Sequence, residues 1–345
     1  SVMCAGSIQF HSIGLLVSAL VMNGLGSLFS WGALQASVAY LSRSGQWGDR
    51  FRHLIPNFTF ITSLAQFAGP SFGGWMTDAS GYLALFFLAA FLALLSCMLS
   101  PWIPQFHVQR NSGDRLPPDG AADPAAGRGM RLARFFGSYK TGYDMMKTNR
   151  MFFLAILLNG VLFILVDVRM TFFPIYMDQL NFTNTQIGFV LSTGGVAAVI
   201  VRPLVGYLMH YINHMWLMLG SILLGAVCLL VLACEPAYGT IAAVMFVWGA
   251  CTGINQPIAM HVVAQSVTLD KQGMGMSLRT MSNRVVQFMN PIVFGGIAAA
   301  VGISAAFGVL AGALVATAGM FYAHQHRLEH RHRHLHRRSN EMEMR

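Results

Sequence analysis

Residues 151–177 have the sequence MFFLAILLNGVLFILVDVRMTFFPIYM, an apolar stretch whose only charged side chains are Asp167 and Arg169. About 20 consecutive apolar residues are enough for an α-helix to cross the hydrocarbon core of a bilayer. We therefore predict a membrane-spanning helix here. Charged side chains at membrane depth are costly and are usually kept for function, so this acid and this base become the first candidates for a site.

The rest of the chain repeats this apolar pattern. Of 345 residues, 55% are hydrophobic and only 10% are charged, whereas a soluble domain carries roughly 25% charged residues. The same composition excludes a disordered chain, a collagen-like chain and a small disulfide scaffold. The fold class is therefore an all-α integral membrane protein. The nine predicted spans are 10–40, 54–77, 82–100, 151–177, 185–209, 215–234, 238–266, 273–299 and 302–323.

The basic residues predict the orientation of the chain. Of the 22 Lys and Arg residues, 18 lie in alternate loops and in the C-terminal tail, and eight of these lie between residues 101 and 150. The intervening loops carry none. Because cytoplasmic loops are enriched in Lys and Arg, we expect the 101–150 loop and the C-terminus to be cytoplasmic, in a cell (inner) membrane. The net charge of +9 then reports topology and predicts no nucleic-acid partner.

An internal repeat divides the chain. A shift of 221 residues matches Pro70 with Pro291, Gly74 with Gly295, Gly81 with Gly302 and Phe86 with Phe307, at equivalent outer turns. Two related helical halves are typical of secondary transporters. We predict a remainder of the N-terminal half at 1–100, a cytoplasmic linker at 101–150, a six-helix C-terminal half at 151–323 and a cytoplasmic tail at 324–345. The offset places the start of the first half about 70 positions before residue 1, so two to three helices are expected upstream.

Short motifs resemble one family of transporters. Gly69, Pro70, Gly73 and Gly74 form a GPxxGG pattern that resembles the core of the antiporter motif of drug/proton exchangers. These exchangers are members of the major facilitator superfamily and carry the motif on their fifth helix. A chain of two six-helix halves joined by a long basic loop resembles that superfamily as a whole. The resemblance implies a bundle of twelve helices, of which this sequence holds about nine.

Two further segments support the same resemblance. Arg202, Pro203 and Gly206 resemble the loop motif between the eighth and ninth helices of the family. The segment 275–291, which contains Arg279, resembles the eleventh helix of bacterial members. The resemblance implies a gating or structural role for the residues of these motifs, whereas snorkelling to the interface would equally account for Arg202.

The ionisable residues inside the spans are candidates for substrate binding or ion coupling. Asp167 and Arg169 diverge by about 200° on a helix, so they are not expected to face one partner. An intramembrane acid can take up and release a proton, although an ion pair would also explain Asp167. Arg169 and Arg284 could recognise a carboxylate. Gln287 and Asn290 continue the polar positions beyond Arg284.

The resemblance also implies that the fourth, seventh and tenth helices line a central cavity. The uncharged polar candidates on these helices are Asn23, Gln35, Asn159, Asn255, Gln256 and His261. Hydrogen bonding between helices is the alternative for each amide and contributes only about 0.6 kcal/mol on average. His261 could relay protons or serve in packing.

The tail is rich in histidine and arginine, with six histidines between His324 and His336. Their spacing matches no defined metal site, so we predict no metal, and attraction to anionic lipid explains the composition more simply. We also predict no cofactor. The sequence carries no HExxH, Walker or Rossmann motif, and its one GxSxG pattern (69–73) lies within the apolar span predicted at 54–77, so we expect no enzyme.

Together these features predict transmembrane transport of a small organic solute by alternating access. Proton-coupled efflux by antiport is the first hypothesis, with a monomer that binds a small molecule, protons and membrane lipid. A symporter importing a sugar, an organic anion or another metabolite is the second. A membrane protein that binds or scaffolds without transporting is an alternative of another class.

Overall fold

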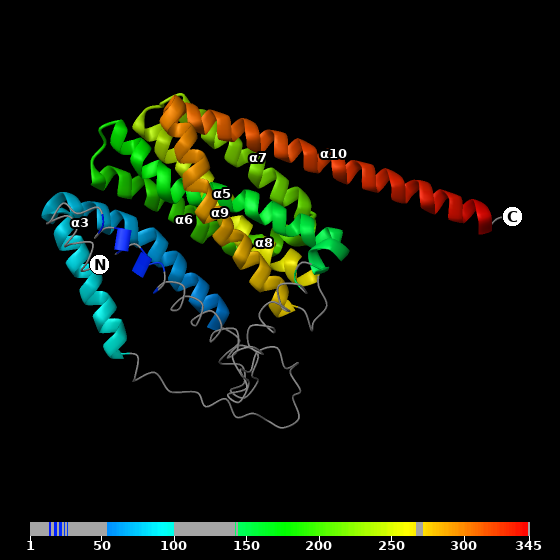
Figure 1. The fold of residues 1–345 in the computed structure, drawn as a ribbon, viewed down its shortest axis with the longest axis horizontal. Coiled ribbons are helices and arrows are strands. Elements are labelled where there is room, and N and C mark those ends of the chain that lie inside the picture. Colours follow the sequence, from blue (N-terminus) through cyan, green and yellow to red (C-terminus); the bar gives the residue numbers. More distant parts are fainter. Residues whose placement is uncertain are drawn as a thin grey trace, which may run out of the picture. The chain divides into compact units, whose positions relative to one another are not determined.

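The structure is a computed structural model that describes residues 54–99, 142, 144–266 and 272–343, with scattered positions between 14 and 26. All regular elements of these residues are α-helices. They are α3 (Leu54–Leu99), α5 (Arg150–Gln179), α6 (Asn184–Tyr211), α7 (His214–Ala233), α8 (Tyr238–Gln265), α9 (Gln272–Val301) and α10 (Ile303–Glu343) (Figure 1). Seven described helices are long and apolar enough to cross a membrane, which agrees with the predicted all-α membrane fold. Most of the span predicted at 10–40 lies outside the described residues.

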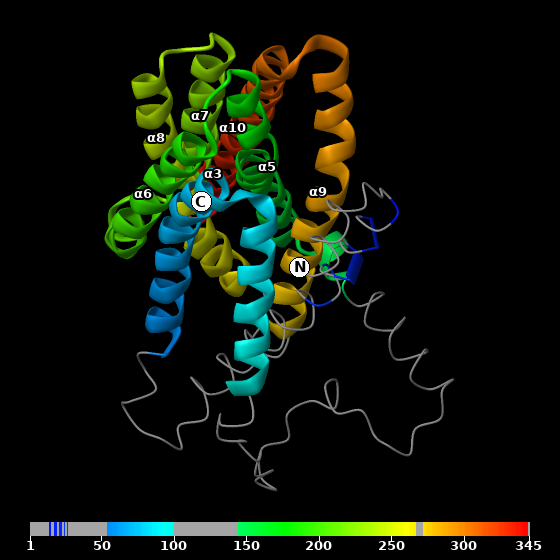
Figure 2. The same cartoon turned by 90° about the vertical axis from the view of Figure 1, so that its left-hand side faces the viewer.

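Helix α3 contains two of the predicted spans, because its backbone leaves the helical conformation at Gly81 (φ 77°, ψ 167°). The two segments fold back on each other as the arms of a hairpin (Figure 2). Gly302, between α9 and α10, has a similar φ of 87°. Side chains disfavour this left-handed region and glycine does not. The two glycines that the 221-residue shift aligns therefore make turns with the same unusual backbone sign.

The contacts of the chain separate two compact units. One consists of Ser1–Pro124 with Asp178–Val199, and the other of Ala125–Met177 with Ile200–Arg345. Helix α6 thus gives its first part to one unit and its last part to the other. The two halves predicted from the sequence, 1–100 and 151–323, differ from these contact-based units and stay a prediction.

Aromatic packing fixes α5 inside the second unit. The Phe173 ring meets Trp248 of α8 edge to face at 6.3 Å, and Tyr176 meets Phe307 of α10 at 5.2 Å. The Tyr176 hydroxyl donates a buried 2.8 Å hydrogen bond to the carbonyl of Leu232 in α7. Such pairs add about 0.5–1.5 kcal/mol each beyond the area they bury. The polar residues of α5 are therefore held on a well-packed helix.

The other helices of this unit pack around one another. Helix α7 contacts α8 and α10, and α9 contacts the same two helices. The apolar part of α10 ends at Ala323, close to the predicted end of the last span. The helix itself continues through Glu343 (Figure 1).

Candidate functional site

Helices α5 and α9 are joined by two amide-mediated contacts. The Asn159 side-chain amide donates to Asn283 Oδ1 at 2.6 Å, and further along α5 the Asn290 amide donates to Asp167 Oδ2 at 2.6 Å. Residue numbers rise together on both helices, so the two helices run in the same direction along this contact. A side chain at Gly160 would touch Ser282, which shows how closely the helices approach.

Asp167 is a buried acid held by a neutral amide. Its side chain is 9% exposed, and within the described residues its side-chain partner is Asn290. A carboxylate that meets an amide instead of a cation keeps its full negative charge in apolar surroundings, which is costly at membrane depth. This arrangement can exchange a proton without breaking an ion pair.

Arg169, two residues further along α5, is also buried. Only 4% of its surface is exposed, and its Nε and Nη1 atoms have no hydrogen-bond partner among the described residues. The positive charge of Arg202, in the last part of α6, lies close enough to interact with it unfavourably. Because α5 is helical at both positions, the divergence of Asp167 and Arg169 stays the expectation from helix geometry.

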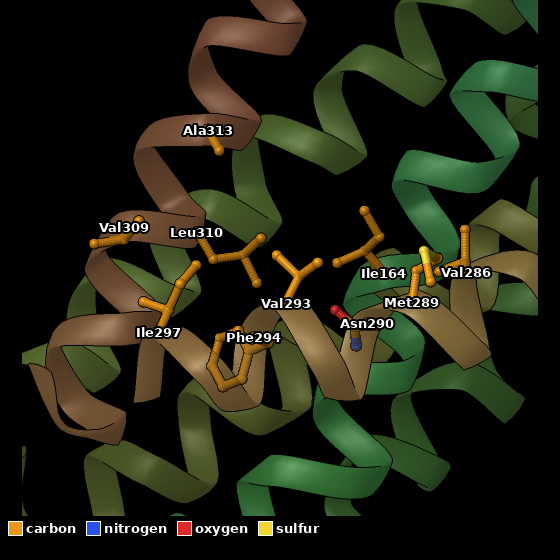
Figure 3. Close-up of a pocket in the computed structure, with 10 residues that line it drawn as sticks. All are labelled: Ile164, Val286, Met289, Asn290, Val293, Phe294, Ile297, Val309, Leu310 and Ala313. Atoms are coloured by element: carbon orange, nitrogen blue, oxygen red, sulfur yellow. The ribbon is translucent and has the colours of Figure 1, made fainter. Parts of the chain in front are cut away.

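A groove opens beside the Asp167–Asn290 pair, between α5, α9 and α10. It has a volume of about 240 Å³, and Asn290 lines it together with nine apolar residues. Ile164 of α5, Val293 of α9 and Leu310 of α10 point into this space beside the Asn290 amide (Figure 3). Through Asn290, the buried acid is linked to an apolar space large enough for part of a small organic molecule.

The GPxxGG motif lies at a close contact between α3 and the first part of α6. A Cβ atom on Gly74 would overlap the backbone of Asn184, and one on Gly188 would overlap the carbonyl of Pro70. A Cβ atom added to Gly69 or to Gly73 would have none of the described atoms within 4 Å. Small residues let two membrane helices approach until their backbones touch. Two members of the motif, Pro70 and Gly74, therefore take part in helix packing.

Polar contacts join the same two helices. The Ser71 hydroxyl donates to Ser192 Oγ at 2.7 Å. Asp78 of α3 accepts from the Thr185 backbone N–H at 2.6 Å, from its hydroxyl at 2.6 Å and from the Asn184 amide at 2.8 Å. A carboxylate at the first turn of a helix satisfies free N–H groups and complements the helix dipole. Asp78 thus caps α6 from another helix.

The remaining candidates lie apart from the Asp167–Asn290 pair. Arg284 is exposed and donates to Gln287 of its own helix at 2.7 Å. Asn255 is buried and Arg279 is half-buried, and the Oδ1 atom of the first and the Nε atom of the second have no hydrogen-bond partner among the residues described. Arg202 is half-buried and Pro203 exposed, both in α6. The positions outside the described residues are Asn23, Gln35, the side chains of Gln256 and His261, and the surroundings of Gly206.

Several residues of the two contacts are not singled out by the sequence. Asn290 is marked there only as one of several polar positions, and Asn283 and Ser192 carry no signal. Asn290 directly precedes Pro291, one of the repeated positions, which is the sole hint. Its partner Asp167 is 123 residues away, and no spacing rule predicts a pair at that distance.

Comparison with known proteins agrees with this architecture. The model of the Major Facilitator Superfamily matches residues 1–214 and 152–341. The chain is also similar to an uncharacterized MFS-type transporter of Methanocaldococcus jannaschii, with 18% identity over 305 residues that cover 86% of this chain and 72% of the relative. The membrane-length helices of the described residues agree with a multi-pass membrane protein, and the family match supports transport of a solute across the membrane. The chain belongs to the Major Facilitator Superfamily.

Proposed function

We propose that the protein exports a small organic solute in exchange for protons, by alternating access, and that Asp167 carries the proton. The observation that supports this proposal most strongly is the buried contact between Asp167 Oδ2 and the Asn290 amide. Among the acids with described side chains, Asp78, Asp144, Asp178 and Glu235 are exposed, and Asp167 alone is buried.

The chemistry of this pair gives two states. An ionised Asp167 accepts from the Asn290 amide N–H, whereas a protonated Asp167 can donate its O–H to the Asn290 amide oxygen once that amide rotates. The first state places a charge beside the apolar groove and the second does not. Because burying an uncompensated charge is unfavourable, uptake of a proton shifts the balance between conformations that hydrate Asp167 and conformations that enclose it.

The direction of transport rests on the GPxxGG pattern. This pattern resembles the antiporter motif of drug/proton exchangers, and its Pro70 and Gly74 contact α6 closely. A contact made by backbone atoms and small side chains can open without leaving a cavity in either helix. We therefore assign the α3–α6 contact to the conformational change and the direction to efflux.

The basic loops support a placement in the inner membrane with a cytoplasmic C-terminus. Attraction between the basic tail and anionic lipid fits the same orientation. We propose a monomer as the transporting unit, with the small organic solute and protons as its partners.

Reconstituted vesicles test both coupling and direction. We would measure accumulation of radiolabelled p-aminohippurate, glucose and N-methylnicotinamide, which represent an anion, a neutral solute and a cation. With the vesicle interior acidic, antiport predicts accumulation of one of these probes. Accumulation that ignores the pH gradient contradicts proton coupling, and accumulation only with the exterior acidic indicates symport.

Asp167→Asn is the informative variant, because an amide keeps the shape and the contact with Asn290 but cannot titrate. We expect gradient-driven accumulation to fall at least tenfold while exchange without a gradient persists. Glu235→Gln is the matched control, since Glu235 is an exposed acid that also accepts one hydrogen bond from a neutral side chain, Ser304. Equal losses in both variants would contradict a special role for Asp167.

Import of an organic anion with protons is the second candidate, and the buried Arg169 favours it. The same vesicles separate the two directions, because symport and antiport respond to opposite gradients.

A further inference from the structure

Arg169 is a charged side chain enclosed by protein without the partners that such a group requires. It is 4% exposed, and in the part of the chain that the structure describes, two of its three guanidinium nitrogens, Nε and Nη1, have no hydrogen-bond partner. Leaving a buried donor unsatisfied costs about 1–3 kcal/mol, and more for a charged group. In a membrane-spanning helix, bulk water does not compensate that cost.

The charges around Arg169 make this cost larger. Asp167 is only two residues away, but it is directed to α9 and held there by Asn290. The other acids described in this unit, Asp144 and Glu235, are exposed. Arg202 adds a second positive charge within interaction range. Within the described part of this unit, no acid is placed to balance Arg169.

We propose that Arg169 binds the anionic group of the transported solute, a carboxylate or a phosphoryl group. This inference rests on the proposed transport function and names its substrate class. A guanidinium group offers several N–H donors in one plane, which match the oxygen atoms of carboxylates and phosphates. The bound anion supplies the acceptors and the negative charge that the protein does not provide.

This assignment gives different roles to Asp167 and Arg169, the two buried charged residues of α5. Asp167 and its Asn290 contact serve the proton, whereas Arg169 on another side of the helix serves the solute. The free site then stores an uncompensated charge, and binding of an anion relieves it. An apolar side chain at position 169 should accordingly make the empty protein more stable while removing its affinity for anions.

Binding to the purified full chain in lipid nanodiscs, without any gradient, tests the inference. Calorimetry and the thermal unfolding midpoint would be measured with p-aminohippurate and with inorganic phosphate at constant ionic strength. Glucose and N-methylnicotinamide are the neutral and cationic comparisons. The first two probes also distinguish a carboxylate site from a phosphoryl site.

We expect at least one of the two anions to bind the wild-type protein and raise its unfolding midpoint. Arg169→Met should weaken that binding at least tenfold and raise the midpoint of the unliganded protein. Arg169→Lys, which keeps the charge but loses the planar donors, should give an intermediate affinity. Lys147→Gln is the matched control, because it removes an exposed cation just before α5 and should leave binding unchanged.

Three results would overturn the inference. They are binding of neither anion to the wild type, unchanged anion affinity in Arg169→Met, and a lower unliganded midpoint in Arg169→Met, which would mean that Arg169 has a structural partner elsewhere. None of them depends on a pH gradient. A failure of proton coupling in the vesicle assay would therefore leave this measurement intact, and the two failures can be told apart.

Discussion

Asp78 at the α3–α6 contact accepts hydrogen bonds from three donors, whereas Arg169 on α5 has two guanidinium nitrogens without a partner in the described ranges. Asp78 is exposed and could be solvated by water without these contacts, and Arg169 is 4% exposed and could not. The exposed carboxylate of Asp78 therefore receives more hydrogen bonds, although the buried guanidinium group of Arg169 depends on them more. The difference shows that the protein supplies partners to the exposed charge at the α3–α6 contact, whereas among the described residues the buried charge on α5 lacks them at two of its nitrogens.

The contrast extends to the packing of the two regions. At the α3–α6 contact, Gly74 and Gly188 let backbones touch, so a larger side chain at either position has no room. Beside Asp167, an apolar groove of about 240 Å³ remains open between α5, α9 and α10. Side chains have no room to grow at the first region, while the second leaves space between its helices.

The largest expected effect comes from breaking the tight contact. Gly188→Ala places a Cβ atom against the Pro70 carbonyl, which belongs to the backbone and cannot rotate away. Overpacking of this kind costs about 1–3 kcal/mol. We expect a clearly lower thermal unfolding midpoint of the purified protein. Gly220→Ala is the control, because a Cβ there meets no atom within 4 Å, and it should be neutral or slightly stabilising.

The second effect is expected when Asp167 loses its hydrogen-bond partner and becomes a buried, unpartnered charge like Arg169. Asn290→Leu removes the amide that holds Asp167 and leaves a buried acceptor unsatisfied, at a cost of about 1–3 kcal/mol. The unfolding midpoint should fall. The double variant Asp167→Leu/Asn290→Leu removes both partners, so it should recover most of that loss. If the double variant is as unstable as Asn290→Leu alone, loss of the Asp167–Asn290 hydrogen bond does not explain the lower midpoint of Asn290→Leu.

A smaller effect is expected when the satisfied charge is removed. Asp78→Ala takes away the cap of α6 and its interaction with the helix dipole, worth about 1 kcal/mol at an exposed helix start. Hydrogen exchange should increase at the first turn of α6, near Thr185, and remain unchanged in α7. Equal exchange in variant and wild type would show that water replaces the carboxylate without loss.

The smallest effect concerns Tyr82, whose hydroxyl donates to Asn184 Oδ1 at 2.9 Å on the exposed side of the same contact. Tyr82→Phe should lower stability by about 0.5 kcal/mol, because water competes for both groups. The thermal unfolding midpoint of Tyr82→Phe, measured in parallel with that of Asp78→Ala, would report this loss of stability. A loss larger than that of Asp78→Ala would reverse the order of importance at this contact.

The elements of the fold could be predicted from local sequence. Apolar runs of sufficient length mark the spans, and the residues that end them are also local. Thus the predicted gap between 77 and 82 coincides with the break at Gly81, and the span predicted at 151–177 is α5 (Arg150–Gln179). A helix in lipid satisfies its own backbone, so its position depends little on distant residues.

The partners within the site could not be predicted in this way. The sequence identifies Asp167 and Arg169 as unusual and predicts that they diverge, because both statements follow from one helix. It does not identify Asn290 as the partner of Asp167, since that contact depends on how α5 and α9 pack. Nor does it distinguish Arg169 from Arg284, of which the first is buried and the second exposed.

Proton movement driven by the solute tests the central claim, that Asp167 couples transport to protons, most directly. Vesicles containing the protein and the dye pyranine would receive p-aminohippurate outside, with no initial pH gradient. The account predicts that solute entry releases protons, so that the interior becomes alkaline with wild-type protein and stays unchanged with Asp167→Asn. An equal alkaline shift with wild type and Asp167→Asn would contradict it.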